Sequence, residues 1–223
     1  IGGRSIHPLG IELGGFATLP DPAKVKETIN LLKDARPKVL DLIDTFSKDK
    51  STFPTNTSFV ALKTKDYNFM EGHIESSTGV KVSEDRFHAH LTDVVLPYST
   101  ADAFKFDRHT YMVGALARLN LNKDALHRKT RKDAAKYLKL FPAECVFKNN
   151  LAQAIEMLHC IDSSIEKLEG AEFAKEKIPE VKAKESSGIG VVEAPRGTLY
   201  HYLEIGKDGK IKNAEFVIPT AQN

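Results

Sequence analysis

The chain has 223 residues, of which 41% are hydrophobic and 28% charged, a composition typical of a folded globular protein rather than a disordered one. Its 32 basic and 30 acidic residues leave a net charge of +2, which argues against a nucleic-acid-binding or membrane-surface protein. No apolar run approaches the roughly 18 residues that a membrane-spanning helix needs, and two cysteines, Cys145 and Cys160, exclude a disulfide scaffold and a cysteine-built metal site within this sequence.

The chain is predicted to open with a loop and a long helical segment. Glycine and proline are frequent over residues 1–20, which favours a shaped loop. Asp21 and Pro22 are typical of an N-cap and a first helical residue, and apolar residues at helical spacing extend the helix to about Ser47. Pro37 is expected either to kink this helix or to divide it in two.

Short strands are expected after the helix. The runs that favour strands, with a hairpin turn at 77–79, are 59–63, 72–76, 80–83 and 87–96. On the last of them, His88 and His90 would face the same side, because alternate residues of a strand share a face. A metal-binding pair would need that arrangement, but a solvent-facing polar side is the favoured interpretation.

The second half is predicted to be helical first and to end in β-structure. Apolar spacing favours helices over 110–121, 124–140 and 149–169. Residues 171–187 are polar and favour a surface helix or a linker, and Asp208-Gly209 favours a β-hairpin between 199–205 and 210–218. Together these elements predict an α+β fold, with a mostly helical core, small antiparallel β elements and a C-terminal β-hairpin.

The run Glu193-Ala194-Pro195-Arg196-Gly197 is the sharpest local feature. Pro195 and Gly197 lie on either side of Arg196 at the entry to the hairpin. Pro195 restricts the backbone conformation before Arg196, and Gly197 permits an unusual conformation after it. A guanidinium presents five donors in a planar fork that suits an anion or a polar ligand. A structural salt bridge, with Glu193 as partner, is an equal alternative from these residues alone.

Two other segments carry less information by themselves. Pro8 restricts His7 to an extended conformation inside the glycine-rich opening, where a hydrogen-bonded turn is the alternative to a functional loop. Pro219 and Thr220 follow the last predicted strand and are typical of a strand end and a capped turn. The Pro219-Thr220 segment indicates no function on its own, whereas both interpretations of the His7 segment stay open.

Three stretches, taken together, resemble the large subunit of nickel–iron hydrogenases. They are GGRSIHPLGIELGGF (2–16), YMVGALARLN (111–120) and EAPRGTLYHYLEIGKDGKIKNAEFVIPTAQN (193–223). They follow the order of the family along the chain, and the last is the most specific. The opening and the PTAQN ending look most like the cytoplasmic, bidirectional members. The resemblance implies the α+β fold of these subunits, which the quinone-reducing subunit of complex I shares.

The resemblance also implies roles for single residues. Arg196 matches an arginine suspended over the metal centre, and we expect it to act first as an electrostatic stabiliser and cyanide donor. Direct proton acceptance comes second, because the pKa of a guanidinium lies above about 12. The other positions that match are the wall formed by Ala194 and Pro195, the contacts to the second cyanide from Pro219 and Thr220, the nearby histidines His7 and His201, and the carbonyl of Phe216 as a magnesium ligand in some relatives.

One departure from the family concerns the metal ligands. The family holds its Ni–Fe centre, with cyanide and carbon monoxide ligands, by four cysteine thiolates in two CxxC pairs, and neither pair is present. Residues 1–223 are therefore expected to be the central portion of a large subunit, lacking both terminal CxxC segments. This portion alone should be inactive and should not bind nickel or iron tightly, because such a site needs thiolates.

The activity that the resemblance implies is reversible heterolytic cleavage of H₂ by the full-length cytoplasmic subunit. Electrons would pass to an iron–sulfur small subunit and on to NAD(P)- or heterodisulfide-reductase-linked subunits, with no nucleic acid and no membrane span. Two alternatives stay open: a metal-free relative such as the complex I quinone-reducing subunit, and a non-catalytic scaffold that uses the fold as a binding surface. The intact APRG run and the PTAQN ending favour a hydrogenase over the metal-free relative.

Overall fold

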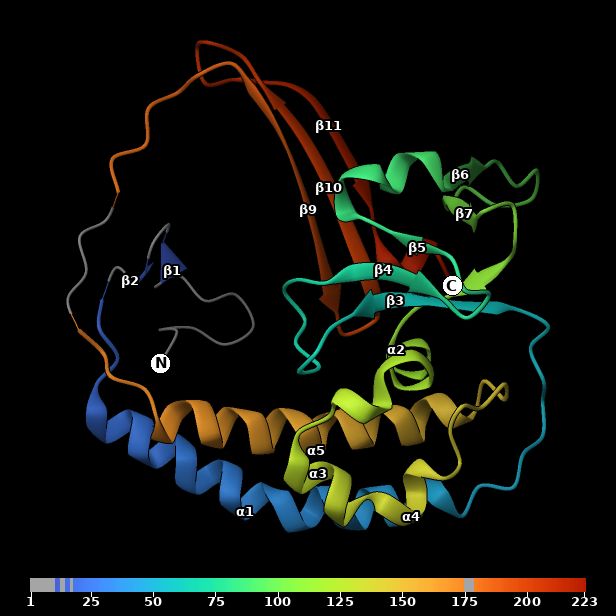
Figure 1. Ribbon diagram of the computed structural model, residues 1–223, viewed down its shortest axis with the longest axis vertical. Coiled ribbons are helices and arrows are strands. Elements are labelled where there is room, and N and C mark those ends of the chain that lie inside the picture. Colours follow the sequence, from blue (N-terminus) through green and yellow to red (C-terminus); the bar gives the residue numbers. More distant parts are fainter. Residues whose placement is uncertain (1–10, 13–14, 17, 175–178) are drawn as a thin grey trace.

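The computed structural model describes residues 11–12, 15–16, 18–174 and 179–223. Helices gather at one end of the molecule and β-sheets at the other (Figure 1). The long helices α1 (Pro22–Ser47) and α5 (Lys148–Glu169) pack against each other, and the short helix α2 (Ala115–Asn122) lies between α5 and the sheets. This mixed architecture confirms the predicted α+β fold.

Helix α1 begins where the sequence predicts. Asp21 accepts a hydrogen bond from the N–H of Ala23 at 2.8 Å, which satisfies one of the free donors of the first turn. The helix then runs through Pro37 as one element of 26 residues. The alternative of two helices is therefore wrong. Val39 and Ile43, beyond the proline, are buried in the helical core, and this packing holds the second half of the helix in place.

Helix α5 carries the apolar face that its sequence predicts. Leu151, Ile155 and Leu158 are fully buried and lie in the core that α5 forms with α1 and α2. This confirms the helix predicted over 149–169, because the observed bounds differ from the expected ones by a single residue at the start.

The predicted single helix over 124–140 is wrong. The segment divides into η2 (Lys123–Ala125), α3 (Arg128–Asp133) and α4 (Ala135–Leu138). Leu126 leaves the helical region with a ψ of 151°, and the ring of His127 then caps α3 by accepting a hydrogen bond from the N–H of Lys129. Local capping thus interrupts a segment whose apolar spacing alone favours one helix.

The middle of the chain forms two small sheets. One has the order β5 (Lys81–Val82), β4 (His73–Ser76), β3 (Ser58–Lys63) and β8 (Tyr111–Met112), and the other pairs β6 (Leu91–Val94) with β7 (Ala103–Phe106). The pairing of β3 with β8 is parallel, whereas the other pairs are antiparallel. A further pair, β1 (Ile11–Glu12) with β2 (Gly15–Phe16), lies near the start of the chain. The strand at 59–63 and the hairpin over 72–83 are confirmed.

Two predictions for residues 87–96 are wrong: that a strand begins at residue 87, and that His88 and His90 share one face of it. The strand expected over 87–96 begins only at β6, because residues before it form the 3₁₀ helix η1 (Glu84–Ala89), whose first turn is acidic. His88 and His90 therefore have separate partners, Glu215 at 3.3 Å and Asp107 at 2.8 Å.

The helix expected over 110–121 also begins late. Tyr111 and Met112 belong to β8, and α2 starts only after Gly114. Gly114 has a φ of 100°, which no helical residue adopts, so the chain changes direction at this glycine. The turn places the first residues of α2 against the C-terminal sheet, as described below.

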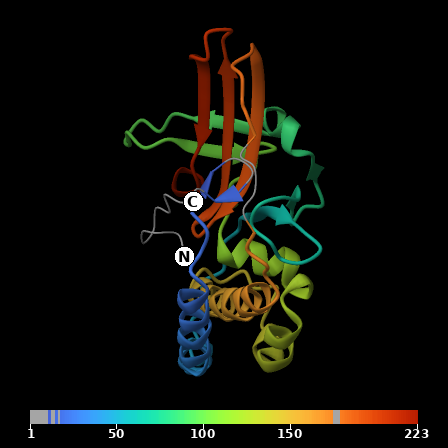
Figure 2. The same cartoon turned by 90° about the vertical axis from the view of Figure 1, so that its left-hand side faces the viewer.

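The C-terminal residues form a three-stranded antiparallel sheet in the order β11 (Ile211–Val217), β10 (Gly197–Ile205), β9 (Ser186–Ala194). Figure 2 shows this sheet rising away from the helical end. The predicted hairpin is confirmed, with Gly209 in its turn at a φ of 77°. Strand β9 was not expected, and the described residues of 171–185 form no helix, so the linker interpretation is the correct one there. None of the helices in the described parts of the chain is long and apolar enough to cross a membrane.

A charged cluster joins α1, α3 and α5, and it makes the stability depend on pH. Arg36 donates to Asp162 and to Asp133, each at 2.7 Å, and Thr130 donates to Asp162 at 2.8 Å. Burial acts to raise the pKa of Asp162, but these hydrogen bonds outweigh it and lower the pKa below its ordinary value of 3.8. A carboxyl group with a lowered pKa stabilises the fold above its unfolded pKa and loses that effect as the pH falls.

We therefore expect the urea midpoint of the wild-type protein to fall between about pH 5 and pH 3 more steeply than that of Asp162→Asn. The control Asp41→Asn removes an exposed carboxylate of α1 that has no ion pair with the described residues, and it should follow the wild type. Equal slopes for the wild type and Asp162→Asn would show that this carboxyl group does not cause the pH dependence.

Candidate functional site

Pro195 and Arg196 form the two-residue connection between β9 and β10, and residues 194–197 are here named the Arg196 turn. Gly197 pairs with Ala194 and has a φ of 137°, which residues with a side chain rarely adopt. A Cβ atom at Gly197 would overlap with Cγ2 of Val113. Only glycine therefore lets the turn approach the segment that precedes α2.

Gly114, at the start of α2, also lies close to the backbone of the Arg196 turn. With its φ of 100°, a Cβ atom at Gly114 would lie 2.9 Å from the carbonyl oxygen of Arg196. The backbone of the Arg196 turn and the start of α2 are thus in direct contact. Two glycines, far apart in the sequence, are both required for that contact.

Arg118, on α2, binds the turn from the protein interior. Its Nε and Nη2 donate to the two carboxylate oxygens of Glu156 at 2.6 and 2.7 Å, and its Nη1 donates to Glu193 at 2.7 Å. The same Nη1 and Nη2 also donate to the carbonyl oxygens of Ala194 at 3.0 Å and Pro195 at 3.2 Å. These bonds match the five donors of a guanidinium, so Arg118 is fully satisfied.

This cluster is buried, with two carboxylates around one guanidinium. The side chains of Arg118, Glu156 and Glu193 are only 3%, 10% and 0% exposed. Burial acts to lower the pKa of Arg118, but the carboxylates of Glu156 and Glu193 raise it above its ordinary value. Burial raises the pKa of Glu193, which its hydrogen bonds oppose only in part. Arg118 therefore stays charged and holds the two acidic side chains together.

The last residues of the chain close the other side of the turn. Asn223 accepts a hydrogen bond from the N–H of Val113 at 2.9 Å and donates to the carbonyl oxygen of Arg196 at 3.3 Å. Gln222 is buried and donates to the carbonyl oxygen of Thr198 at 2.7 Å. Polar side chains from the C-terminus thus fix the backbone on both sides of Gly197.

The side chain of Arg196 itself is exposed and has no hydrogen bond or ion pair with any residue that the structure describes. The alternative that Arg196 forms a structural salt bridge with Glu193 is wrong, because Glu193 is turned inward and binds Arg118. The geometry therefore combines a rigid backbone with an unpaired cation. Such an arrangement can present the five donors of the guanidinium to an anion or polar ligand outside this part of the chain.

The structure brings some of the predicted site residues together. Ala194, Pro195 and Arg196 share the turn. Pro219 is buried and begins the short helix η3 (Pro219–Ala221), directly before the C-terminal residues that bind the turn, and Thr220 is exposed on the same helix.

Other predicted residues lie apart from the turn or outside the described residues. His201 and Phe216 face each other across β10 and β11, with ring centroids 4.7 Å apart in an edge-on contact. His201 lies five residues from Arg196, which corresponds to about 17 Å of extended strand. His7 lies outside the described residues.

The described residues do not provide ligands for a thiolate-held metal centre. They contain no group of three or more His, Cys, Asp or Glu side chains that could hold a metal ion. Cys145 has its sulfur near the backbone of Ser51 and Phe53, and Cys160 is an exposed residue of α5. The donor set of this part of the chain therefore does not fit the metals themselves, whereas the unpaired guanidinium of Arg196 fits an anionic group.

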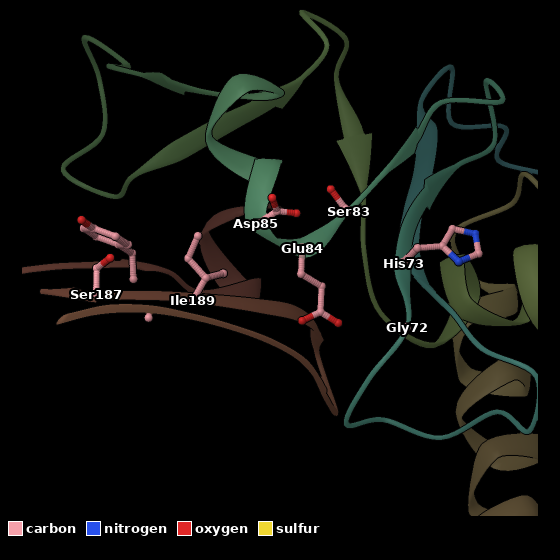
Figure 3. Close-up of a pocket in the computed structure, with 9 residues that line it drawn as sticks. Gly72, His73, Ser83, Glu84, Asp85, Ser187 and Ile189 are labelled. Atoms are coloured by element: carbon pink, nitrogen blue, oxygen red, sulfur yellow. The ribbon is translucent and has the colours of Figure 1, made fainter. Parts of the chain in front are cut away.

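A groove of about 600 Å³ lies elsewhere, between η1 and the β9–β10 strands. Figure 3 shows Glu84 extending from η1 toward β9, where Ser187 and Ile189 lie on the opposite side. Ile189 is five residues before Ala194, again about 17 Å of extended strand. None of the predicted site residues that the structure describes lines this groove, which is separate from the Arg196 turn.

Comparison with known proteins decides the family. Residues 62–223 match the model of a protein family described as nickel-dependent hydrogenase. This range includes α2, α5, the Arg196 turn and the C-terminal segment. The chain belongs to the nickel-dependent hydrogenase family. The alpha subunit of sulfhydrogenase 1 from Pyrococcus furiosus is 29% identical to the whole chain, and the alignment covers 53% of that subunit. The beta subunit of an NAD-reducing hydrogenase from Cupriavidus necator is 34% identical over 50% of the chain.

Solved hydrogenase structures share the fold. An NAD⁺-reducing [NiFe]-hydrogenase in the H₂-reduced state aligns over the whole chain with a TM-score of 0.65 and 23% identity, and 55% of that structure is covered. The Ni-Fe-Se hydrogenase of D. vulgaris Hildenborough aligns with a TM-score of 0.72 at 20% identity, with 56% covered. The chain thus spans about half the length of these two structures and of the Pyrococcus furiosus subunit.

Sequence reasoning missed the residues that hold the Arg196 turn in place. Arg118 lies inside the apolar YMVGALARLN stretch, where a charged residue is unusual. Glu156 is buried, but it lies away from the Leu151, Ile155 and Leu158 stripe of α5. A charged residue inside an apolar helical stretch was a signal that could have found Arg118, because buried charges are paired in folded proteins. The periodicity of α5 gave no such signal for Glu156. The partners themselves could not be assigned without the three-dimensional arrangement.

Proposed function

We propose that this chain is part of the catalytic subunit of a nickel–iron hydrogenase, which cleaves H₂ heterolytically and reversibly. Residues 1–223 would be the central portion of that subunit, with the thiolate ligands supplied by segments outside it. The observation that carries the proposal is the guanidinium of Arg196 on a rigid turn, unpaired among the residues that the structure describes, within a chain of the hydrogenase family.

In this proposal Arg196 stabilises anionic groups next to the Ni–Fe centre and donates to a cyanide ligand. A guanidinium keeps its proton near neutral pH, so Arg196 would serve there as a fixed positive charge. Ala194 and Pro195 would form the wall beside it, and Pro219 and Thr220 would contact the second cyanide. The centre, with its carbon monoxide and cyanide ligands, would be held entirely by residues outside the described ones.

The remaining predicted residues would act at a greater distance. The carbonyl oxygen of Phe216 would be a magnesium ligand, as the resemblance to some relatives implies. His201, which contacts the ring of Phe216, and His7 would orient neighbouring groups or pass protons. All of these roles are subordinate to that of Arg196.

The partners in this proposal are a small iron–sulfur subunit, together with further NAD(P)- or heterodisulfide-reductase-linked subunits, in the cytoplasm. Support comes from two relatives, one named as part of an NAD-reducing hydrogenase from Cupriavidus necator and the other as a hydrogenase iron-sulfur subunit from Archaeoglobus profundus. The described residues have no cysteine cluster for an iron–sulfur centre of their own, so electrons would leave through a partner.

The Arg196→Lys variant of the intact subunit, in its complex, tests the function. Lysine keeps the charge but loses the planar fork, so H₂ uptake with an artificial electron acceptor should fall by at least about 100-fold, in the range seen when a donor to a transition-state charge is lost. Nickel and iron content, measured by mass spectrometry of the metals, should stay at the wild-type level.

Arg131→Lys is the matched control. Arg131 is an exposed arginine of α3 whose side chain has no partner among the described residues, and its variant should keep wild-type uptake. Near-normal uptake by Arg196→Lys with metals bound would contradict the proposed role. Absence of nickel and iron from the wild-type protein would contradict hydrogenase activity and favour the metal-free relative.

A further inference from the structure

We propose that Arg118 is a positioning residue, whose guanidinium sets the backbone of the Arg196 turn and thereby the place of the Arg196 side chain. This inference rests on the proposed function of Arg196. The carbonyl groups that Arg118 binds belong to Ala194 and Pro195, the two residues directly before Arg196. A shift of Arg118 would therefore move the backbone from which the Arg196 side chain extends.

The carboxylates around Arg118 fix it from two independent elements. Glu156 comes from the middle of α5 and binds Nε and Nη2 with both of its oxygens, and it also accepts a hydrogen bond from Tyr67 at 2.7 Å. Glu193 comes from β9 and accepts further bonds from Leu62 N–H at 2.8 Å and from Thr198 at 2.9 Å. The guanidinium has no rotational freedom left, because each carboxylate is itself held in place.

Stability alone is a poor explanation for this cluster. Replacing a buried ion pair by apolar side chains of similar size is often neutral or stabilising, because charges lose their hydration on burial. A core that only needed filling would use apolar residues at these positions, as the neighbouring positions of α2 and α5 do. The ionic cluster instead provides directional bonds, and two of these end on the turn.

The fork geometry identifies arginine as the required residue. Lysine has one nitrogen and cannot reach two carboxylates and two carbonyl groups at once. Arg118→Lys keeps the buried positive charge but should release the carbonyl groups of Ala194 and Pro195. The turn would then keep its β9–β10 pairing, its glycine contacts and the bond from Asn223, but it would lose the donors that bind the two carbonyl groups before Arg196.

The test compares Arg118→Lys with Arg36→Lys in the intact, metal-loaded complex. Arg36 is a partly buried arginine that also binds two carboxylates, Asp162 and Asp133, but it lies on α1 and has no contact with the turn. In Arg118→Lys, hydrogen exchange of the peptide 193–199 should be at least about ten times faster than in the wild type, and turnover should fall about 100-fold, as expected for a misplaced catalytic group. In Arg36→Lys, both should stay unchanged even if the melting temperature falls.

A double variant separates positioning from general damage. If Arg118 acts through Arg196, then Arg118→Lys should cost little further turnover in an Arg196→Lys background. Should Arg118→Lys fail to fold, Glu156→Gln replaces it, because the amide keeps the shape of the carboxylate while removing its charge. We expect faster exchange of 193–199 in that variant as well.

Two results would overturn the inference: unchanged exchange of 193–199 in both cluster variants, or turnover losses that multiply fully in the double variant. Failure of the proposed function would look different, because Arg196→Lys alone would then keep its turnover. In that case the exchange of 193–199 would still decide whether Arg118 holds the turn.

Discussion

The Arg118→Met variant should lose about 3–5 kcal/mol of unfolding free energy, the cost of removing one partner from a buried ion pair. Methionine fills a similar volume, but it leaves the carboxylates of Glu156 and Glu193 without their cation in a site that water does not reach. The carbonyl groups of Ala194 and Pro195 would lose their donors at the same time. Urea denaturation of the metal-free polypeptide, followed by far-ultraviolet circular dichroism, measures the loss.

An exposed ion pair provides the control for this experiment. Lys33 on α1 binds Glu169 on α5 at 2.7 Å, and both side chains are about half exposed. Lys33→Met should change the unfolding free energy by less than about 1 kcal/mol, because exposed pairs contribute little. If Arg118→Met were as mild as Lys33→Met, the buried cluster would not be a strongly coupled ionic unit.

The helices that the sequence predicts well are those with a long apolar stripe. Helix α5 buries Leu151, Ile155 and Leu158 along one face, so periodicity alone is sufficient to find it. The segment after α2 has similar spacing but is broken by Leu126 and by the capping ring of His127. A cap formed by a histidine ring is not among the usual helix-start signals, so the break could not be predicted from local propensity.

The strands that could be predicted are likewise those that local sequence signals determine. The C-terminal hairpin has its turn residues in the sequence, and it forms as expected. Strand β9 has two glycines and a polar start, and it is a strand because β10 offers it a partner over nine residues. Pairing with a neighbour, rather than the residues of β9 themselves, therefore determines that strand.

The sequence pointed to Arg196 as the candidate residue, but it did not point to the residues that hold the Arg196 turn in place. The residues on either side of Arg196 and the resemblance to the family both indicated this residue, and the structure places it on a tight turn with a free guanidinium among the described residues. Arg118 and Asn223 are distant from the turn in the sequence, and each binds it through backbone carbonyl groups. Backbone groups carry no signature in the sequence, so these contacts could be found only in three dimensions.

The Gly197→Ala variant should lose roughly 2–6 kcal/mol of unfolding free energy, which reflects both a strained backbone and an overpacked contact. The φ of 137° is one that alanine rarely adopts, and the new methyl group would overlap with Cγ2 of Val113. Gly190→Ala, on the neighbouring strand, adds a methyl group that meets no atom of the described residues within 4 Å, so it should change stability by no more than about 0.5 kcal/mol. Urea denaturation of the two variants measures the difference. Equal unfolding free energies for Gly197→Ala and Gly190→Ala would mean that the Arg196 turn and the start of α2 are not in close contact. That result would contradict the conclusion that this backbone contact positions Arg196.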